Sequence, residues 1–394
     1  MSLTLPEPNE QEQAHSQRLQ RRIAEVIDDA GGWISFARYM EMALYEPGLG
    51  YYVAGRQKFG AAGDFVTAPE VSSLFSSCLA RQCAEVLQQQ ASAACVLELG
   101  AGSGVMAADV LLQLEQLDCL PDHYYILELS AELMARQRAT LEEKVPHLVG
   151  SVRWLQALDG LQLHGVVLAN EVLDAMPVSC FSAYPDRVVE RGVTLGQNGF
   201  SWQDRTADDE LRGRVEVLRR SQDVGPWPSP YHSEINPQLS GWVAMLSEHL
   251  AAGLILLIDY GYPRADYYHP QRSEGTLLGY YRQRALEDPF WLPGLQDITA
   301  SVDFTAVAEA GIEAGLELAG YTTQAWFLMA NGLETLYQTA LEKADERQRL
   351  MLSKQIKLLT LPAEMGERFQ VIGFSRGLEA PPQGFLMQDY SQRL

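Results

Sequence analysis

The fold is decided by residues 96–104, which read Val-Leu-Glu-Leu-Gly-Ala-Gly-Ser-Gly. A short apolar strand ends at Leu99 and helical spacing begins at Val105, so the glycines form the turn between strand and helix. Glycine allows a sharp turn and a close approach to a ligand. In doubly wound sheets, ligands bind beyond the carboxyl ends of the strands. We therefore expect a ligand at Gly100, Ala101, Gly102 and Gly104.

The spacing of these glycines indicates which ligand. A dinucleotide fingerprint has the form G-x-G-x-x-G and would place its third glycine at position 105, which is Val105. Here the third glycine is Gly104, and Glu98 precedes the turn. The resulting E-x-G-x-G-x-G pattern suits an aminosulfonium compound without a pyrophosphate. S-adenosyl-L-methionine is the expected cofactor, with Glu98 at its site, while a tight turn without any ligand is the alternative.

Short apolar strands and helices alternate around this turn. Strands are expected at 95–99, 124–127, 152–155 and 166–169, with helices at 105–117 and 130–143. This rhythm predicts a mostly parallel sheet with right-handed crossovers, a Rossmann-like α/β fold.

The flanking segments follow other patterns. Residues 1–15 are polar and expected to fray, and 16–46 are expected to be helical. Residues 178–220 alternate as in strands, with a hairpin turn at Asn198-Gly199. The segment at 262–300 shows little periodicity and reads as a long loop. The domain prediction is a helical cap (1–90), a cofactor-binding core (91–177), an antiparallel β insertion (178–232), and the rest of the core with a substrate loop, C-terminal helices and a last strand (233–394).

Acidic side chains follow the expected strands. Glu128 ends the second strand, where a carboxylate can accept hydrogen bonds from the hydroxyls of a ribose. The fourth strand continues into Asn170, Glu171 and Asp174, which are expected to face the methyl acceptor. Methyl transfer needs alignment and electrostatics, and an acceptor nitrogen must also lose a proton to a base. Paired carboxylates can hold a guanidinium in a bidentate fork, although Asp174 could instead cap a helix.

The composition of the chain disfavours several classes of function. The formal net charge of −21 disfavours nucleic-acid binding and is compatible with a basic protein substrate. The chain has no uncharged apolar run of membrane-spanning length, and neither a membrane partner nor a metal site is expected. The 5 cysteines have no C-x-x-C pair and are expected to be reduced. The acidic N-terminus resembles neither a secretory signal nor a presequence, so a cytoplasmic location is expected. Formation of a homodimer is left open as an alternative to a monomer.

A second signature lies upstream, at residues 63–72, which read Gly-Asp-Phe-Val-Thr-Ala-Pro-Glu-Val-Ser. By itself, Thr67-Ala68-Pro69-Glu70 predicts a helix capping box. Together with the glycine turn, Asn170–Pro177, Asp259-Tyr260-Gly261 and residues 297–304, this signature resembles the MidA family of class I methyltransferases. The resemblance covers roughly residues 30–380.

The resemblance implies further site residues and an activity. Asp64, Thr67 and Pro69 would lie on a segment that closes over the cofactor, Glu70 would be either functional or a helix cap, and Asp259 would line the acceptor side. Eukaryotic members look like protein arginine methyltransferases that modify a respiratory complex I subunit. No transit sequence is visible, so the chain looks bacterial and its acceptor need not be the same.

Four functions are therefore compared. The first is a protein methyltransferase acting on arginine, favoured by the acidic surface and by Glu171 with Asp174. The second is a small-molecule methyltransferase on the same scaffold. The third is an assembly chaperone that binds the cofactor without catalysis. The fourth, a nicotinamide oxidoreductase, is disfavoured by Val105.

Overall fold

The computed structural model describes residues 6–54, 67–90, 94–221 and 224–394. The chain packs as two compact units. Unit 1 comprises residues 1–65, 173–239 and 262–303, and unit 2 comprises 66–172, 240–261 and 304–394. Each unit thus combines segments that are far apart in the sequence. The four segments predicted from the sequence stay a prediction.

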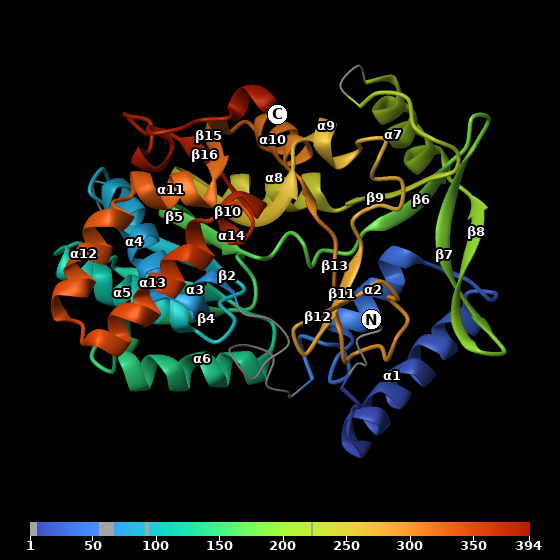
Figure 1. Ribbon diagram of the computed structural model, residues 1–394, viewed down its shortest axis with the longest axis horizontal. Helices are drawn as coiled ribbons and strands as arrows, with labels where there is room; N and C mark the ends of the chain where they lie inside the picture. The colour runs from blue at the N-terminus through green and yellow to red at the C-terminus, as the bar shows by residue number, and fades with distance from the viewer. Residues whose placement is uncertain (1–5, 55–66, 91–93, 222–223) are drawn as a thin grey trace. The chain divides into compact units, whose positions relative to one another are not determined.

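Unit 2 is built on the sheet that the glycine turn predicts (Figure 1). Along its main path the strand order is β15-β16-β10-β5-β2-β3-β4. Strands β2, β3, β4, β5 and β10 pair in parallel, and β16 runs antiparallel to both of its neighbours. The mostly parallel α/β fold is therefore confirmed. The strands of this path are β2 (Ala94–Leu99), β3 (His123–Leu127), β4 (Val152–Leu155), β5 (Leu163–Asn170), β10 (Leu250–Tyr262), β15 (Glu317–Thr323) and β16 (Phe369–Arg376).

The strand order creates a switch point beside β2. After β2 the chain adds β3 and β4 on one side, and then returns to place β5 on the other side. The crossover connections after β2 and β5 therefore leave in opposite directions, which opens a crevice at their carboxyl ends. The glycine turn follows β2, and Asn170 ends β5. Both motifs thus lie at this switch point.

Helices cover the sheet because their apolar faces need burial. Buried residues of α4 and α5 form one core cluster with Val96, Tyr124, Val166 and Leu256, which belong to four adjacent strands. The helices of unit 2 are α3 (Ala68–Val71), α4 (Ser73–Leu87), α5 (Val105–Gln116), α6 (Ala131–Lys144), α8 (Leu239–His249), α10 (Phe304–Glu313), α11 (Gln324–Ala330), α12 (Leu333–Lys343), α13 (Glu346–Thr360) and α14 (Met365–Arg368), with short 3-10 turns at Val149–Ser151, Gln383–Phe385 and Ser391–Arg393.

Unit 1 contains the expected antiparallel insertion. Its larger sheet has the order β1-β7-β6-β9, with β8 paired to β7. Gly196 pairs with Gly199 across the predicted hairpin turn. The expectation of strands up to residue 220 is wrong at its end, because Asp208 caps a helix over Asp209–Arg220 that buries Leu211, Val215 and Leu218 on one side.

The remaining elements of unit 1 correct the predicted long loop. Residues 278–299 form a small antiparallel sheet with the order β12-β11-β13, rather than an unpaired segment. The elements are α1 (Glu10–Asp29), β1 (Ile34–Ser35), α2 (Phe36–Tyr45), β6 (Ser179–Ala183), β7 (Val188–Gly196), β8 (Gly199–Thr206), α7 (Asp209–Arg220), β9 (Tyr231–Ile235), α9 (Arg264–Tyr267), β11 (Leu278–Tyr281), β12 (Arg284–Leu286), β13 (Asp297–Thr299) and β14 (Val302–Asp303).

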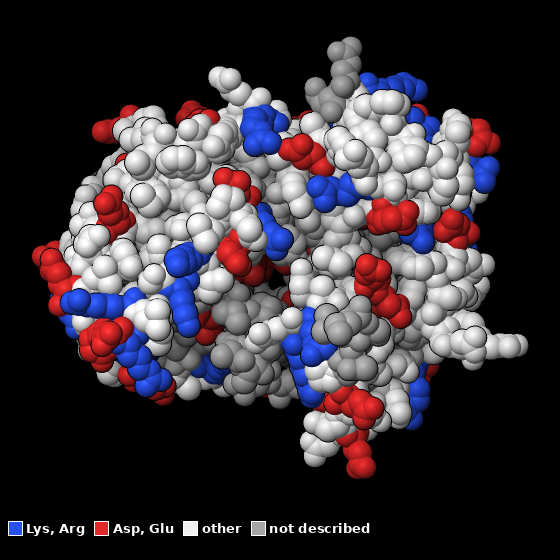
Figure 2. All heavy atoms as spheres, in the orientation of Figure 1, with Lys and Arg blue, Asp and Glu red and all other residues white. Residues whose placement is uncertain are grey.

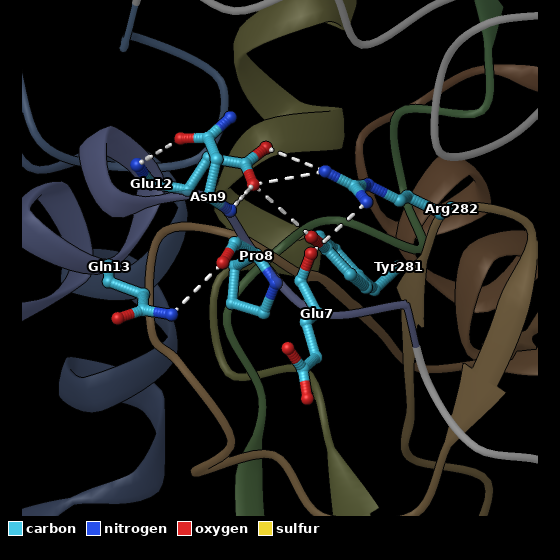
Figure 3. A network of polar contacts seen from close by, with 7 residues as sticks. All are labelled: Glu7, Pro8, Asn9, Glu12, Gln13, Tyr281 and Arg282. Carbon is cyan, nitrogen blue, oxygen red and sulfur yellow. Dashed lines mark hydrogen bonds and ion pairs between the residues drawn. The ribbon is translucent and has the colours of Figure 1, made fainter.

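The polar N-terminal segment is ordered earlier than its composition predicts. Helix α1 starts at Glu10, and Asn9 and Glu12 form a reciprocal capping box with bonds of 2.9 and 2.8 Å. The same Glu12 carboxylate also accepts a hydrogen bond of 3.0 Å from the guanidinium of Arg282, which lies in the turn after β11 (Figure 3). The expectation that 1–15 frays is therefore wrong from Glu10 onward. Within the described residues, no helix combines the length and the apolar character that crossing a bilayer requires.

Candidate functional site

The glycine turn has the geometry that requires glycine. Gly100, Gly102 and Gly104 have φ values of +65°, +52° and +82°, in the left-handed region that favours glycine. The Gly104 N–H donates to the Ala101 carbonyl at 2.8 Å and closes the turn. A Cβ at Gly104 would lie 2.9 Å from the Cα of Gln137. The sequence therefore folds into a tight loop at the start of α5, with glycine at the three positions that have positive φ.

The turn also touches the segment after β5. A Cβ at Gly100 would meet a methyl group of Val172 at 3.4 Å, and Gly100 itself is exposed. Ala101 is buried beneath the turn. Thus the exposed backbone of Gly100 and the residues that follow β5 border the same end of the sheet.

Glu128 lies at the end of β3 with a fixed carboxylate. It is 8% exposed, and one oxygen accepts a hydrogen bond from the Ser130 N–H at 2.9 Å. The other oxygen accepts from the Gln137 side-chain amide, also at 2.9 Å. Each carboxylate oxygen can accept more than one hydrogen bond. The group can therefore still receive hydroxyl donors such as those of a ribose.

Glu98 lies in an enclosed environment near the end of β2. Its side chain is 1% exposed and accepts a hydrogen bond of 2.6 Å from the Tyr124 hydroxyl. Burial raises the pKa of the Glu98 carboxyl to about 7, and the Tyr124 bond opposes that rise. The carboxyl thus lies within the core under the helices, and its direct contact with a cofactor stays a prediction.

The backbone at the end of β5 is strained. Glu171 has φ +54°, a left-handed conformation that is costly for a residue with a Cβ. Its N–H donates to the Ile258 carbonyl at 2.9 Å, and the Asn170 amide donates to its carboxylate at 3.1 Å. Among the residues that the structure describes, none hydrogen-bonds to the buried Oδ1 of Asn170. That oxygen can accept a hydrogen bond from an N–H group of a bound molecule.

Asp259 follows directly on the neighbouring strand. Asn170 pairs with Ile258 across β5 and β10, so Asp259 lies next to the start of the Glu171 segment. Its side chain is fully buried and accepts from the Tyr260 N–H at 2.9 Å. The structure therefore brings Asn170 and Glu171, at the end of β5, next to Asp259 on the neighbouring strand β10.

The segment before α4 corrects another prediction. Thr67 makes no side-chain cap, and α3 stops after Val71, so the capping box is wrong. The Glu70 carboxylate instead accepts a hydrogen bond from the Ser103 hydroxyl of the glycine turn. Pro69 is buried and Thr67 is half-buried, and their roles in cofactor binding stay predictions. Asp64 lies outside the described residues.

Asp174 belongs to unit 1, where it is 5% exposed. Its backbone carbonyl accepts from the Ala300 N–H at 3.0 Å. The hydroxyl of Tyr52 donates to both oxygens of the buried Asp297, at 2.8 and 3.0 Å. Burial raises the pKa of Tyr52, and the negative charges of Asp297 and Asp174 raise it further. Within unit 1, two acidic side chains therefore share the surroundings of one tyrosine.

Sequence reasoning missed three polar residues at these places. Gln137 contacts both the glycine turn and Glu128, Ser103 ties that turn to α3, and Asp297 binds Tyr52. For Gln137 a signal existed, because it takes a buried position four residues after Leu133 and four before Leu141. The partners of Ser103 and Asp297 are Glu70 and Tyr52, which are remote in sequence, so no local pattern predicts these contacts.

Comparison with known proteins decides the family. Residues 78–322 match the profile described as "Putative S-adenosyl-L-methionine-dependent methyltransferase". The chain belongs to the MidA family of S-adenosylmethionine-dependent methyltransferases. The predicted family, the class I fold and the cofactor class are thereby confirmed.

Several MidA-family relatives cover most of the chain. A crystal structure of a Burkholderia thailandensis protein bound to S-adenosyl-homocysteine is 43% identical, has a TM-score of 0.92, and covers 99% of this chain and 100% of that one. The protein arginine methyltransferase NDUFAF7 of Mus musculus is 29% identical over 366 residues, 86% of this chain and 80% of the relative. That of Danio rerio is 27% identical over 372 residues, with 86% and 83% covered.

Proposed function

We propose that this MidA-family protein transfers a methyl group from S-adenosylmethionine to an arginine side chain of a protein acceptor. The cofactor supplies an electrophilic methyl group on its sulfonium. The observation that carries the proposal is Glu171, a carboxylate residue held in a left-handed conformation at the switch point of the sheet. Such strain costs about 1–3 kcal/mol and gathers at functional sites.

The residues of unit 2 fit the cofactor. The glycine turn leaves the backbone of Gly100 exposed. The Glu128 carboxylate accepts hydrogen bonds from the Ser130 N–H and from the Gln137 amide, and a carboxylate held in this way is a suitable acceptor for ribose hydroxyls. The S-adenosyl-homocysteine bound to the Burkholderia thailandensis relative supports this assignment.

Acceptor chemistry falls to the residues after β5. The Glu171 carboxylate can hold two N–H groups of a guanidinium and align one nitrogen with the methyl group. It can then take the proton that this nitrogen loses as the new bond forms. Asn170 Oδ1 offers a further acceptor for an N–H, and Asp259 lies beside this segment on β10. Asp174 stays a prediction on the acceptor side.

The choice of arginine is supported by the relatives and by charge. The mouse and zebrafish relatives carry the name protein arginine methyltransferase, and they share 27–29% identity with this chain. A guanidinium is cationic at every physiological pH, so a carboxylate is its natural partner. The net charge of −21 favours a basic acceptor protein.

The test is methylation by the purified chain of arginine peptides and of matched lysine peptides, followed by mass spectrometry. Glu171→Gln is expected to lower kcat by about 100-fold or more, since a lost base and a lost charge both act on the transition state. Its affinity for S-adenosyl-homocysteine should change less than about threefold. Glu132→Gln, an exposed acid on α6, serves as the control and should match the wild type.

Each other outcome contradicts part of the proposal. Transfer of the methyl group to small molecules, with no methylated peptide or protein, would make the protein a small-molecule methyltransferase. Full activity of Glu171→Gln would remove Glu171 from catalysis. Cofactor binding with no methylated product from cell lysate would favour the chaperone.

A further inference from the structure

Gln137 is an amide buried where helix α6 would normally place an apolar residue. It is fully buried and lies on the same side of α6 as Leu133 and Leu141. Burial of an amide is costly unless its polar atoms are paired. The Nε2 group donates to Glu128 at 2.9 Å and to the Gly102 carbonyl at 3.2 Å. Oε1 accepts from Trp154 Nε1 at 3.0 Å. Every part of the amide is therefore used.

Trp154 determines which way the amide points. Its indole nitrogen can only donate a hydrogen bond, so it must face the amide oxygen of Gln137. The amide NH2 is then forced toward Glu128 and Gly102. The guanidinium of Arg138 lies 4.7 Å from the centre of the Trp154 ring and packs against it. The orientation of Gln137 is thus fixed from β4.

The backbone of α6 at the same position packs on the glycine turn. The Gly104 site has room for a hydrogen only, because the Cα and carbonyl oxygen of Gln137 would lie 2.9 and 3.1 Å from a Cβ. One residue therefore contacts the second and third glycines as well as the carboxylate of Glu128. A shift of α6 would move all of them together.

We propose that Gln137 is a positioning residue that aims the Glu128 carboxylate at the ribose of the cofactor, with Trp154 fixing its orientation. The proposal rests on the proposed function in one respect, that Glu128 receives the ribose. Glu128 also accepts a hydrogen bond from the Ser130 N–H, so the carboxylate is held from the start of α6 and from its middle. Without Gln137 the carboxylate loses the bond that comes from the middle of α6, and with it part of what sets its direction.

The test compares S-adenosyl-homocysteine with its 2′-deoxy analogue by calorimetry. The wild type should bind the deoxy compound about 10–100-fold more weakly, because a site built for a hydroxyl rejects a ligand that lacks it. Gln137→Leu should weaken the binding of S-adenosyl-homocysteine by a similar factor. The Kd values of S-adenosyl-homocysteine and of its 2′-deoxy analogue should then differ by about threefold or less. Glu128→Gln should do the same, and the double variant should add little, since the two residues act as a unit.

Two further variants separate positioning from stability. Leu141→Val, at a fully buried apolar site of the same helix, should lower Tm and keep the wild-type ratio. Trp154→Phe keeps Gln137 and an aromatic ring but removes the N–H donor that orients the amide, so the ratio of the two Kd values should fall several-fold. If Gln137→Leu does not fold, Trp154→Phe decides the question.

The contrary results are distinct. A folded Gln137→Leu, or a Trp154→Phe, with the wild-type ratio would overturn the positioning role. A wild type that binds neither compound would overturn both this role and the proposed function. A wild type that binds and discriminates but methylates no acceptor would contradict the proposed function alone.

Discussion

At the scale of single residues, the site depends on side chains whose surroundings change their chemistry. Glu98 lies near the end of β2 and Glu128 directly follows the adjacent strand β3, yet Glu98 is enclosed by the core and Glu128 accepts hydrogen bonds from N–H donors. A carboxylate that accepts from N–H groups stays charged, whereas one that is merely buried favours its neutral form. The same residue type therefore has different surroundings at two neighbouring strands, and for Glu98 burial raises the pKa of the carboxyl to about 7.

Glu98 gives stability a pH dependence. Its carboxyl titrates at about 7 in the folded protein against an ordinary value of 4.5, so between these values the folded state binds more protons than the unfolded state. The free energy of unfolding should therefore fall as pH rises from 4.5 to about 7, by up to about 3 kcal/mol, and Glu98 should add no further change above that.

Glu98→Gln, which is neutral at every pH, should remove this slope and leave the protein more stable than the wild type at pH 8. Urea unfolding of both proteins between pH 4 and 8 measures the difference. Curves that stay parallel over the whole range would show that Glu98 does not titrate there.

At the scale of elements, distant segments hold one another in place. The turn between β11 and β12 consists of Arg282 and Gln283, with φ values of +48° and +61°. Positive φ at both positions is typical of the type I′ two-residue hairpin, which usually has Asn and Gly there. Arg282 instead binds Glu12, which also caps α1 (Figure 3). The ion pair therefore links a strained turn to a helix start.

Two substitutions at Glu12 separate its roles. Glu12→Ala removes the return bond of the capping box and the ion pair, while Glu12→Gln keeps the cap and loses only the charge. Hydrogen exchange in the first turn of α1 should speed up about tenfold in Glu12→Ala, equivalent to about 1.4 kcal/mol. In Glu12→Gln the change should be about threefold or less. Equal exchange in both variants would assign the whole effect to the ion pair.

At the scale of the whole molecule, charge sets the encounter with an acceptor. The chain carries 51 acidic and 30 basic residues, the latter being Lys and Arg. Figure 2 shows acidic and basic side chains interspersed over the visible face. The excess of acidic residues therefore attracts cations through a field spread over the surface, and not through a single acidic patch.

Salt should therefore weaken the use of basic acceptors. For an arginine peptide with a net charge of about +5, kcat/KM should fall roughly fivefold between 0.05 and 0.5 M NaCl, because the screening length shortens from about 14 to about 4 Å. A peptide of the same length with neutral flanks should change less than about twofold. Steady-state rates at several salt concentrations check this, and equal slopes for the two peptides would contradict it.

The sequence by itself determined the local features. The apolar runs of 95–99, 124–127 and 152–155 predicted the strands β2, β3 and β4 closely, because strand periodicity and glycine turns are encoded within a few residues. The E-x-G-x-G-x-G spacing predicted the cofactor class of the family, since a close approach of backbone needs glycine at fixed positions.

Only the tertiary structure decided what those features face. The capping box at Thr67 failed because Glu70 reaches Ser103, 33 residues away, and the loop prediction for 262–300 failed because β11 pairs with β12 and β13. Likewise, Gln137 gained its role from Gly102, Glu128 and Trp154, which three different segments supply. Such contacts depend on the order of strands in the sheet, and that order is a property of the packed molecule that no window of neighbouring residues contains.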